Sequence, residues 1–254
     1  MKRFNLLKRL FHLVFKLKYS GSYLGILWSF FNPIIMAVIF TIVFKYILKI
    51  QVENFPLFLF SGIVAWNFLS ANLINSCFTF IKNHEIIQKI KFDYEMLLMA
   101  EIIVNTIIFA INLLILTLFS FVSGVKISLI IFLIHFPLML IMLLLLSYSF
   151  GLILASITVF IRDIPHFTEI FLTIWLYVSP VFYVPSMIPD KIMTFLIYNP
   201  VFYPLIAIRK IFYQKDFAGD NWNIFWINLG VIIGIFVLSR IVYKKTEKHF
   251  PEYV

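Results

Sequence analysis

Residues 127–161 read ISLIIFLIHFPLMLIMLLLLSYSFGLILASITVFI and contain no Lys, Arg, Asp or Glu. A helix of about 20 apolar residues crosses the hydrocarbon core of a bilayer, so this run is long enough to span a membrane. The same pattern recurs along the chain, and an all-α integral membrane protein is therefore expected. The further uncharged runs are 19–44, 54–81, 102–125, 170–189, 192–208 and 221–239.

The composition excludes other protein classes. Of 254 residues, 62% are hydrophobic and 13% are charged, whereas soluble domains carry about 25% charged residues. The mean hydropathy is +0.99. A soluble enzyme and a disordered chain are excluded. The net charge of +9 does not indicate a nucleic-acid partner, because the charges cluster at the termini and between apolar runs, as expected beside anionic lipids.

The run 192–208 is the weakest candidate span because it is short and interrupted by proline. Proline removes a backbone donor and disfavours helix in the residue before it. Residues 185–215 are therefore predicted to form a re-entrant outer hairpin, shielded from lipid by the rest of the protein. We expect six transmembrane helices, with this hairpin between spans five and six. The residues that interrupt or precede the run are Pro180, Pro185, Pro189, Asn199, Pro200 and Pro204.

The positive charges support an even number of spans. With the N-terminus inside, most of the 21 Lys and Arg residues lie on the cytoplasmic side, as the positive-inside rule requires. Seven spans would put Lys244 and Lys245 outside. Both termini are therefore predicted to be cytoplasmic.

Residues 1–20 are predicted to form an amphipathic interfacial helix. Lys8 and Lys16 lie on one face, and Leu10 and Val14 lie on the other. The helix is interpreted first as a membrane anchor, and a docking surface for a partner is compatible with that role.

The sequence contains no motif for chemistry on this chain. It has no phosphate-binding loop, no nucleophile elbow and no metal-ligand spacing among its five histidines. The single Cys77 is expected to be a small buried residue. No ionised residue falls deep within a predicted span, which disfavours a proton-coupled transporter. No catalytic residue, metal or cofactor is predicted here, so the driving energy must come from a partner.

Uncharged polar and aromatic residues form two patterns. In the second and third predicted spans, Asn and Ser residues recur at helical spacing, and aromatic residues cluster near the outer end. Both sets could line a path for a polar substrate. Alternatively, the polar residues form interhelical hydrogen bonds, and the aromatic residues form a belt at the membrane interface. The candidate channel-lining residues are Asn72, Asn75, Ser76, Asn105, Asn112, Trp175, Tyr177, Tyr183 and Tyr198.

Small residues recur at helical spacing in two spans. Ser147, Gly151 and Ala155 form a ridge in span four, and Gly230 and Gly234 repeat the pattern in span six. Such residues let helices approach closely, so both sets are predicted to be packing surfaces, with a dimer interface as one option.

Three motifs occur in order along the chain. Residues 18–33 combine a basic and polar start with Leu-Gly-x-x-Trp and Asn-Pro, residues 160–164 contain an Arg-Asp pair after span four, and Ser179–Tyr183 precedes a later Asn-Pro. With these motifs the chain resembles the membrane subunit of ABC-2 type exporters, in the polysaccharide, O-antigen, capsule and teichoic-acid branch. The resemblance covers nearly the whole chain and implies one ABC-2 transmembrane domain over residues 1–254. Its gate or motif residues would be Trp28, Pro33, Arg162, Asp163, Pro180, Pro189, Asn199 and Pro200.

The resemblance also implies partners. This chain would form a homodimer bound to two copies of a separate ABC ATPase, which carries ATP and Mg. The complex would sit in the bacterial cytoplasmic (inner) membrane and move a polymer linked to undecaprenyl diphosphate. Residues 82–96 would be a cytoplasmic coupling helix, and Arg162 and Asp163 would stabilise the inner gate. An equally weighted interpretation makes Asp163 a helix cap. The implied ATPase-coupling residues are Glu85, Ile86, Gln88, Lys89, Lys91 and Phe92.

Three other functions compete with this one. An ABC-2 drug or small-lipid exporter usually lacks the Ser-Pro and Asn-Pro pattern. A membrane-embedded glycan-processing enzyme would depend on the carboxylates of Asp190, Asp216 and Asp220 in the outer loops. A passive channel or scaffold would transport without nucleotide.

Overall fold

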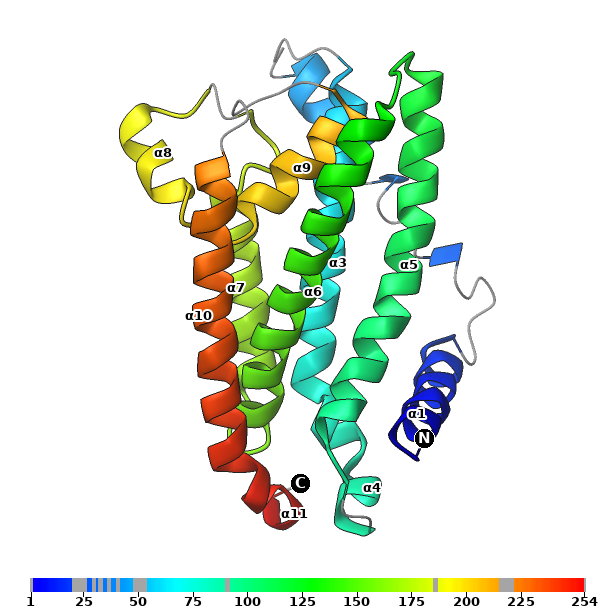
Figure 1. Cartoon of the computed structure of the whole chain (residues 1–254), viewed down its shortest axis with the longest axis vertical. Helices are drawn as coiled ribbons and strands as arrows, with labels where there is room; N and C mark the ends of the chain where they lie inside the picture. Colours follow the sequence, from blue (N-terminus) through cyan, green and yellow to red (C-terminus); the bar gives the residue numbers. More distant parts are fainter. Residues whose placement is uncertain are drawn as a thin grey trace.

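The structure, a computed structural model, describes residues 2–19, 27–28, 31, 34–35, 38–39, 42–47, 54–89, 92–184, 187–214 and 222–253. All regular structure in these ranges is helical, and the long helices run side by side along the longest axis of the molecule (Figure 1). Trp28 is described and is exposed. Pro33, Lys91, Asp216, Asp220 and most of the expected first span lie outside the described residues.

Among the described residues, four helices are long and apolar enough to cross a membrane, and each overlaps a predicted run. The last of them, α10, continues almost directly into two short C-terminal elements, η4 and α11. These agreements support a multi-pass membrane protein. The bounds are α3 (Phe55–Lys82), α5 (Glu95–Val122), α6 (Leu129–Thr158), α10 (Trp222–Thr246), η4 (Glu247–His249) and α11 (Phe250–Tyr253).

Helix α3 is the centre of the bundle and packs against both α5 and α6. The predicted ridge of small residues lies at this contact, because Ser147, Gly151 and Ala155 are all fully buried. A Cβ atom added at Gly151 would lie 2.5 Å from Ser76 Oγ, so glycine is what permits the close approach of α6 to α3. The packing role predicted for this ridge is confirmed.

The fifth apolar helix differs from its predicted range of 170–189. Helix α7 (Ile164–Val178) begins earlier and ends before Pro180. The residue before a proline is driven towards extended backbone, and Ser179 has φ −82° and ψ 143°. With 15 residues, α7 is about 22 Å long, less than the ~30 Å of a hydrocarbon core.

Two short helices follow at the end of the bundle opposite the C-terminus (Figure 1). They are α8 (Asp190–Leu196) and α9 (Phe202–Phe212), separated by a turn at Asn199 and Pro200. Nearly every side chain of α9 is buried, and the helix packs against α3, α6 and α10. The chain thus turns back into the bundle after α8.

The remaining elements are α1 (Lys2–Tyr19), η2 (Ile42–Ile47) and α4 (His84–Lys89). Helix α1 lies against α5, with Leu10 buried and Lys8 and Lys16 exposed. Helix α4 lies at the same end of the bundle as α11 and packs against it (Figure 1). We call this end of the molecule the α4 end.

Candidate functional site

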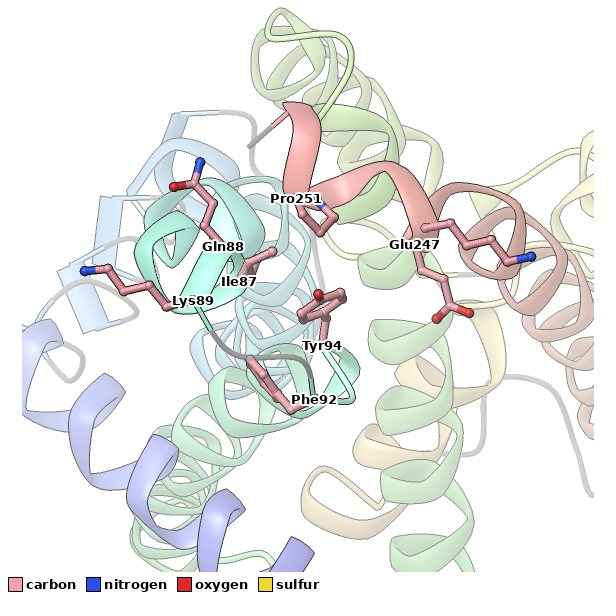
Figure 2. A pocket seen from close by; sticks show the side chains of 8 residues that line it. Ile87, Gln88, Lys89, Phe92, Tyr94, Glu247 and Pro251 are labelled. Atoms are coloured by element: carbon pink, nitrogen blue, oxygen red, sulfur yellow. The ribbon is translucent and has the colours of Figure 1, made fainter.

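A groove at the α4 end lies between α4 and the C-terminal elements η4 and α11 (Figure 2). Its volume is about 630 Å³. Both walls carry charged and apolar side chains, so the groove suits a protein surface of mixed character. The lining residues are Ile87, Gln88, Lys89, Phe92, Tyr94, Glu247, Lys248 and Pro251.

Helix α4 is shorter than the helix predicted over residues 82–96. Asn83 interrupts the path from α3, and its Nδ2 donates to the carbonyl of Thr79 at 2.8 Å. The predicted segment therefore divides into the end of α3, the six residues of α4, and the start of α5. A single continuous helix over this range is wrong, because the Asn83 turn precedes α4 and residues 92–94 are not helical before α5 begins at Glu95.

Some of the predicted coupling residues line the groove, and others do not. Gln88, Lys89 and Phe92 line the groove, whereas Glu85 and Ile86 do not. Glu85 and Lys89 are exposed and form an ion pair at 3.7 Å along the helix. Ile87, which sequence reasoning did not select, is buried and anchors α4 to the core.

The C-terminal wall of the groove was not predicted. Phe250 is fully buried, with its ring centroid 4.9 Å from that of Phe80 and 6.1 Å from that of Tyr94. Arg162 Nη2 donates to the backbone carbonyl of Tyr253 at 3.1 Å. Aromatic residues in a basic tail were the available signal in the sequence.

The Arg162–Asp163 pair occupies the connection between α6 and α7, and both residues are exposed. Asp163 is the N-cap residue of α7, and its backbone carbonyl accepts from the N–H of His166 at 3.1 Å. Its side chain makes no capping hydrogen bond. Asp163 therefore occupies the cap position without the side-chain hydrogen bond that a helix cap usually makes. The gate role of Arg162 and Asp163 stays a prediction.

A charged cluster around a buried carboxylate lies just inside the α4 end. Glu95, the first residue of α5, accepts hydrogen bonds from Arg240 of α10 and from Tyr148 of α6. Arg240 Nη1 also lies 3.0 Å from Tyr148 Oη. Glu95 is 7% exposed, so this carboxylate is held by its partners rather than by water. We call these three residues the Glu95 cluster.

The Glu95 cluster was missed because each charge fell just beyond a predicted span. The sequence placed Glu95 at the end of the predicted coupling helix over residues 82–96, and Arg240 directly after span six. In the structure α5 begins at Glu95 and α10 continues past Arg240, so the two charges meet across the bundle.

The polar residues of α3 and α5 bond with each other within the bundle. Asn105 Nδ2 donates to Asn72 Oδ1 at 2.8 Å, and Asn72 Nδ2 lies 3.3 Å from Ser147 Oγ. Both asparagines are buried, and so is Ser76 opposite Gly151. The polar groups of Asn72, Ser76 and Asn105 are therefore used in helix packing in this structure, as the interpretation of interhelical hydrogen bonds predicts, and the channel-lining role stays a prediction.

The other two predicted polar residues are placed differently. Asn75 is half-buried. Asn112 is buried and donates to the carbonyl of Ile108, one turn earlier, at 3.1 Å. Neither takes part in the bonds between Asn72, Asn105 and Ser147 described above.

The Asn-Pro motif organises the opposite end of the bundle. Trp175 Nε1 donates to Asn199 Oδ1 at 3.0 Å, and Asn199 Nδ2 lies 2.9 Å from Ser179 Oγ. Trp175 is 8% exposed, which places it in the core rather than on a channel surface. Asn199 therefore connects α7 to the turn before α9.

The remaining predicted residues at this end have mixed environments. Tyr177 and Tyr198 are exposed, whereas Tyr183 is half-buried and donates its hydroxyl to the carbonyl of Val178 at 2.8 Å. Among the motif prolines, Pro180 is buried, Pro189 is exposed and Pro200 is half-buried.

Arg209 in α9 is a buried cation, and no sequence pattern predicts its place in the core. Its exposed fraction is 0%, and its guanidinium lies 3.8 Å from the ring centroid of Phe58. Nη2 donates to the carbonyl of Val181 at 2.8 Å. A Cβ atom at Gly62 would lie 2.9 Å from this nitrogen, so glycine makes room for the arginine.

The chain matches the family model described as "ABC-2 type transporter" over residues 5–213. It is 27% identical over 234 residues to an O-antigen export system permease protein RfbA of Klebsiella pneumoniae, covering 91% of this chain and 90% of that protein. The RfbA protein of Myxococcus xanthus, which has the same description, is 27% identical over 201 residues, or 78% of this chain and 76% of that protein. The chain is therefore a membrane transporter subunit rather than an enzyme, and it belongs to the ABC-2 type transporter family.

Proposed function

We propose that this chain is the permease subunit of an ATP-driven exporter for a lipid-linked polysaccharide of the O-antigen type. The observation that carries the proposal is similarity along about nine-tenths of both chains to a protein named as an O-antigen export permease. Because the similarity covers most of both chains, it favours a common transport function and not merely one common segment. Capsule and teichoic-acid polymers belong to the same substrate class.

The proposed complex is a homodimer of this chain with two ABC ATPase subunits, which supply the ATP and Mg sites. The lack of a phosphate-binding loop in the sequence supports a separate motor. Each permease subunit has six spans and lies in the cytoplasmic membrane of a bacterium. Residues 185–215 form the re-entrant outer segment, and the buried position of α9 supports this.

The α4 end faces the cytoplasm in this proposal. Lys82, Lys89, Lys244, Lys245 and Lys248 gather there, as the positive-inside rule favours. Helix α1 is the interfacial helix, and its exposed lysines face the lipid headgroups.

The ATPase is proposed to act on α4. This helix lies directly between α3 and α5 in the chain, so a force on it reaches two spans through short connections. Gln88 and Lys89 are exposed on α4 and line the groove, which makes them accessible to a partner. Lys91 has the same proposed role.

Co-expression with a candidate ABC ATPase subunit from the same genome tests the proposal. The wild-type pair is expected to co-purify and to restore surface polysaccharide in a bacterium whose own O-antigen permease gene is deleted. Changing Lys89 to Glu in this complex should leave ATP hydrolysis intact and lower export. Failure of the wild-type pair to co-purify, or surface polymer without ATP hydrolysis, would overturn the proposal.

A further inference from the structure

The Glu95 cluster joins three helices through one carboxylate. Glu95 of α5 accepts from Arg240 of α10 and from Tyr148 of α6, and Arg240 also contacts Tyr148. A buried carboxylate needs such partners, because an ion without them is strongly destabilised in a low-dielectric interior. The three side chains therefore tend to move together or not at all.

The position of the Glu95 cluster in the chain shows which helices it links. Glu95 is the first residue of α5 and follows α4 after a short connection. Helix α5 packs against α1, α3 and α6, whereas α10 packs mainly against α6 and α9. The ion pair between Glu95 and Arg240 is thus a direct polar connection from the α4 segment to the last span.

A second connection supports the same path. Tyr94, beside Glu95, contacts the buried ring of Phe250, which also packs against Tyr243 with ring centroids 6.0 Å apart. Tyr243 lies one turn after Arg240, whose guanidinium is 5.8 Å from that ring. The polar and aromatic contacts therefore join the same two places in the chain: residues 94–95 and the end of α10.

We infer that the Glu95 cluster transmits the displacement of α4 to α10, so that the last span moves with α3 and α5 when the ATPase acts. This inference rests on the proposed function and adds residues that position α10 without touching substrate or nucleotide. The Glu95–Arg240 ion pair, with Glu95 buried and Arg240 half-buried, can be formed or broken, and salt-bridge networks with two such arrangements carry energetic coupling. The ATPase would drive α10 only while the ion pair is formed.

The test uses the full permease–ATPase complex with Glu95→Gln, Arg240→Gln, the exchange Glu95→Arg with Arg240→Glu, and Tyr148→Phe. Lys126→Gln is the matched control, because Lys126 is exposed in the connection between α5 and α6 at the opposite end. Three quantities are measured for each variant: co-purification with the ATPase, the rate of ATP hydrolysis, and polymer exported per ATP. The polymer is a lipid-linked O-antigen polysaccharide made by the host.

Each single charge variant should assemble and hydrolyse ATP but export about tenfold less polymer per ATP, which lies within the usual range of coupling between two sites. The exchange should recover much of this loss, Tyr148→Phe should show a smaller loss, and the control should match wild type. Unchanged export per ATP in the single variants overturns the inference. If they fail to assemble, normal export per ATP by Tyr148→Phe overturns it instead.

The two proposals fail in different ways. A wild-type complex without ATP-dependent export contradicts the proposed function. A wild-type complex that exports normally while all cluster variants match it contradicts only the role of the Glu95 cluster.

Discussion

Replacing Gly151 with alanine tests the packing of α6 against α3. The new Cβ atom would lie 2.5 Å from Ser76 Oγ and 3.2 Å from Leu98 Cδ1. Overpacking of this kind costs about 1–3 kcal/mol. Ser76 Oγ cannot move away freely, because it donates to the carbonyl of Asn72 at 2.6 Å. Alanine returns about 0.5–1 kcal/mol of helix propensity, so we expect a net loss of up to about 2.5 kcal/mol in the free energy of unfolding.

Gly234→Ala is the matched control in α10. No atom lies within 4 Å of a Cβ added at Gly234, so only the propensity gain remains, and stability should rise or stay unchanged. Unfolding of the purified chain in detergent micelles, titrated with sodium dodecyl sulfate, measures both variants. The double variant Ser76→Gly with Gly151→Ala removes the hydroxymethyl group that the new methyl group would meet and should recover stability. Equal effects of Gly151→Ala and Gly234→Ala would refute the reasoning.

Three further substitutions test other parts of the structure. Arg209→Met removes the hydrogen bond to Val181 and leaves that carbonyl without this donor, so the free energy of unfolding should fall by about 1–3 kcal/mol in the same titration. Trp175→Phe keeps a ring but deprives Asn199 of the indole donor, which should cost about 1–2 kcal/mol. Phe250→Ala empties a fully buried position, and a loss of about 3–5 kcal/mol or faster proteolysis of the C-terminal segment is expected; an unchanged protease pattern would contradict this packing.

The long helices could be predicted because their signal is local. The uncharged runs correspond to α3, α5, α6 and α10, and the Gly151 ridge was identified from spacing alone. The boundary of α7 was displaced because a count of apolar residues ignores what Pro180 does to the backbone before it. Residues 82–96 looked like one amphipathic helix because the effect of Asn83 on the backbone is not visible in periodicity.

The site was less predictable because its contacts join distant parts of the chain. Glu95 meets Arg240 across 145 residues, and no local pattern relates the two. Arg209 follows an apolar run and therefore looked like a surface charge, although α9 turns it into the core. The stripe containing Asn72 has the same spacing whether it lines a channel or packs helices, so spacing alone could not predict the bond to Asn105.

ATP-dependent movement of polymer in proteoliposomes tests the central claim most directly. The permease and its ATPase are reconstituted with a lipid-linked O-antigen polysaccharide on the outer leaflet, and ATP is added outside. The polymer should become protected from an added glycosidase only when ATP and both proteins are present. Protection without ATP, or no protection while ATP is hydrolysed by the intact complex, would contradict the claim that this chain is an exporter permease for this class of polymer.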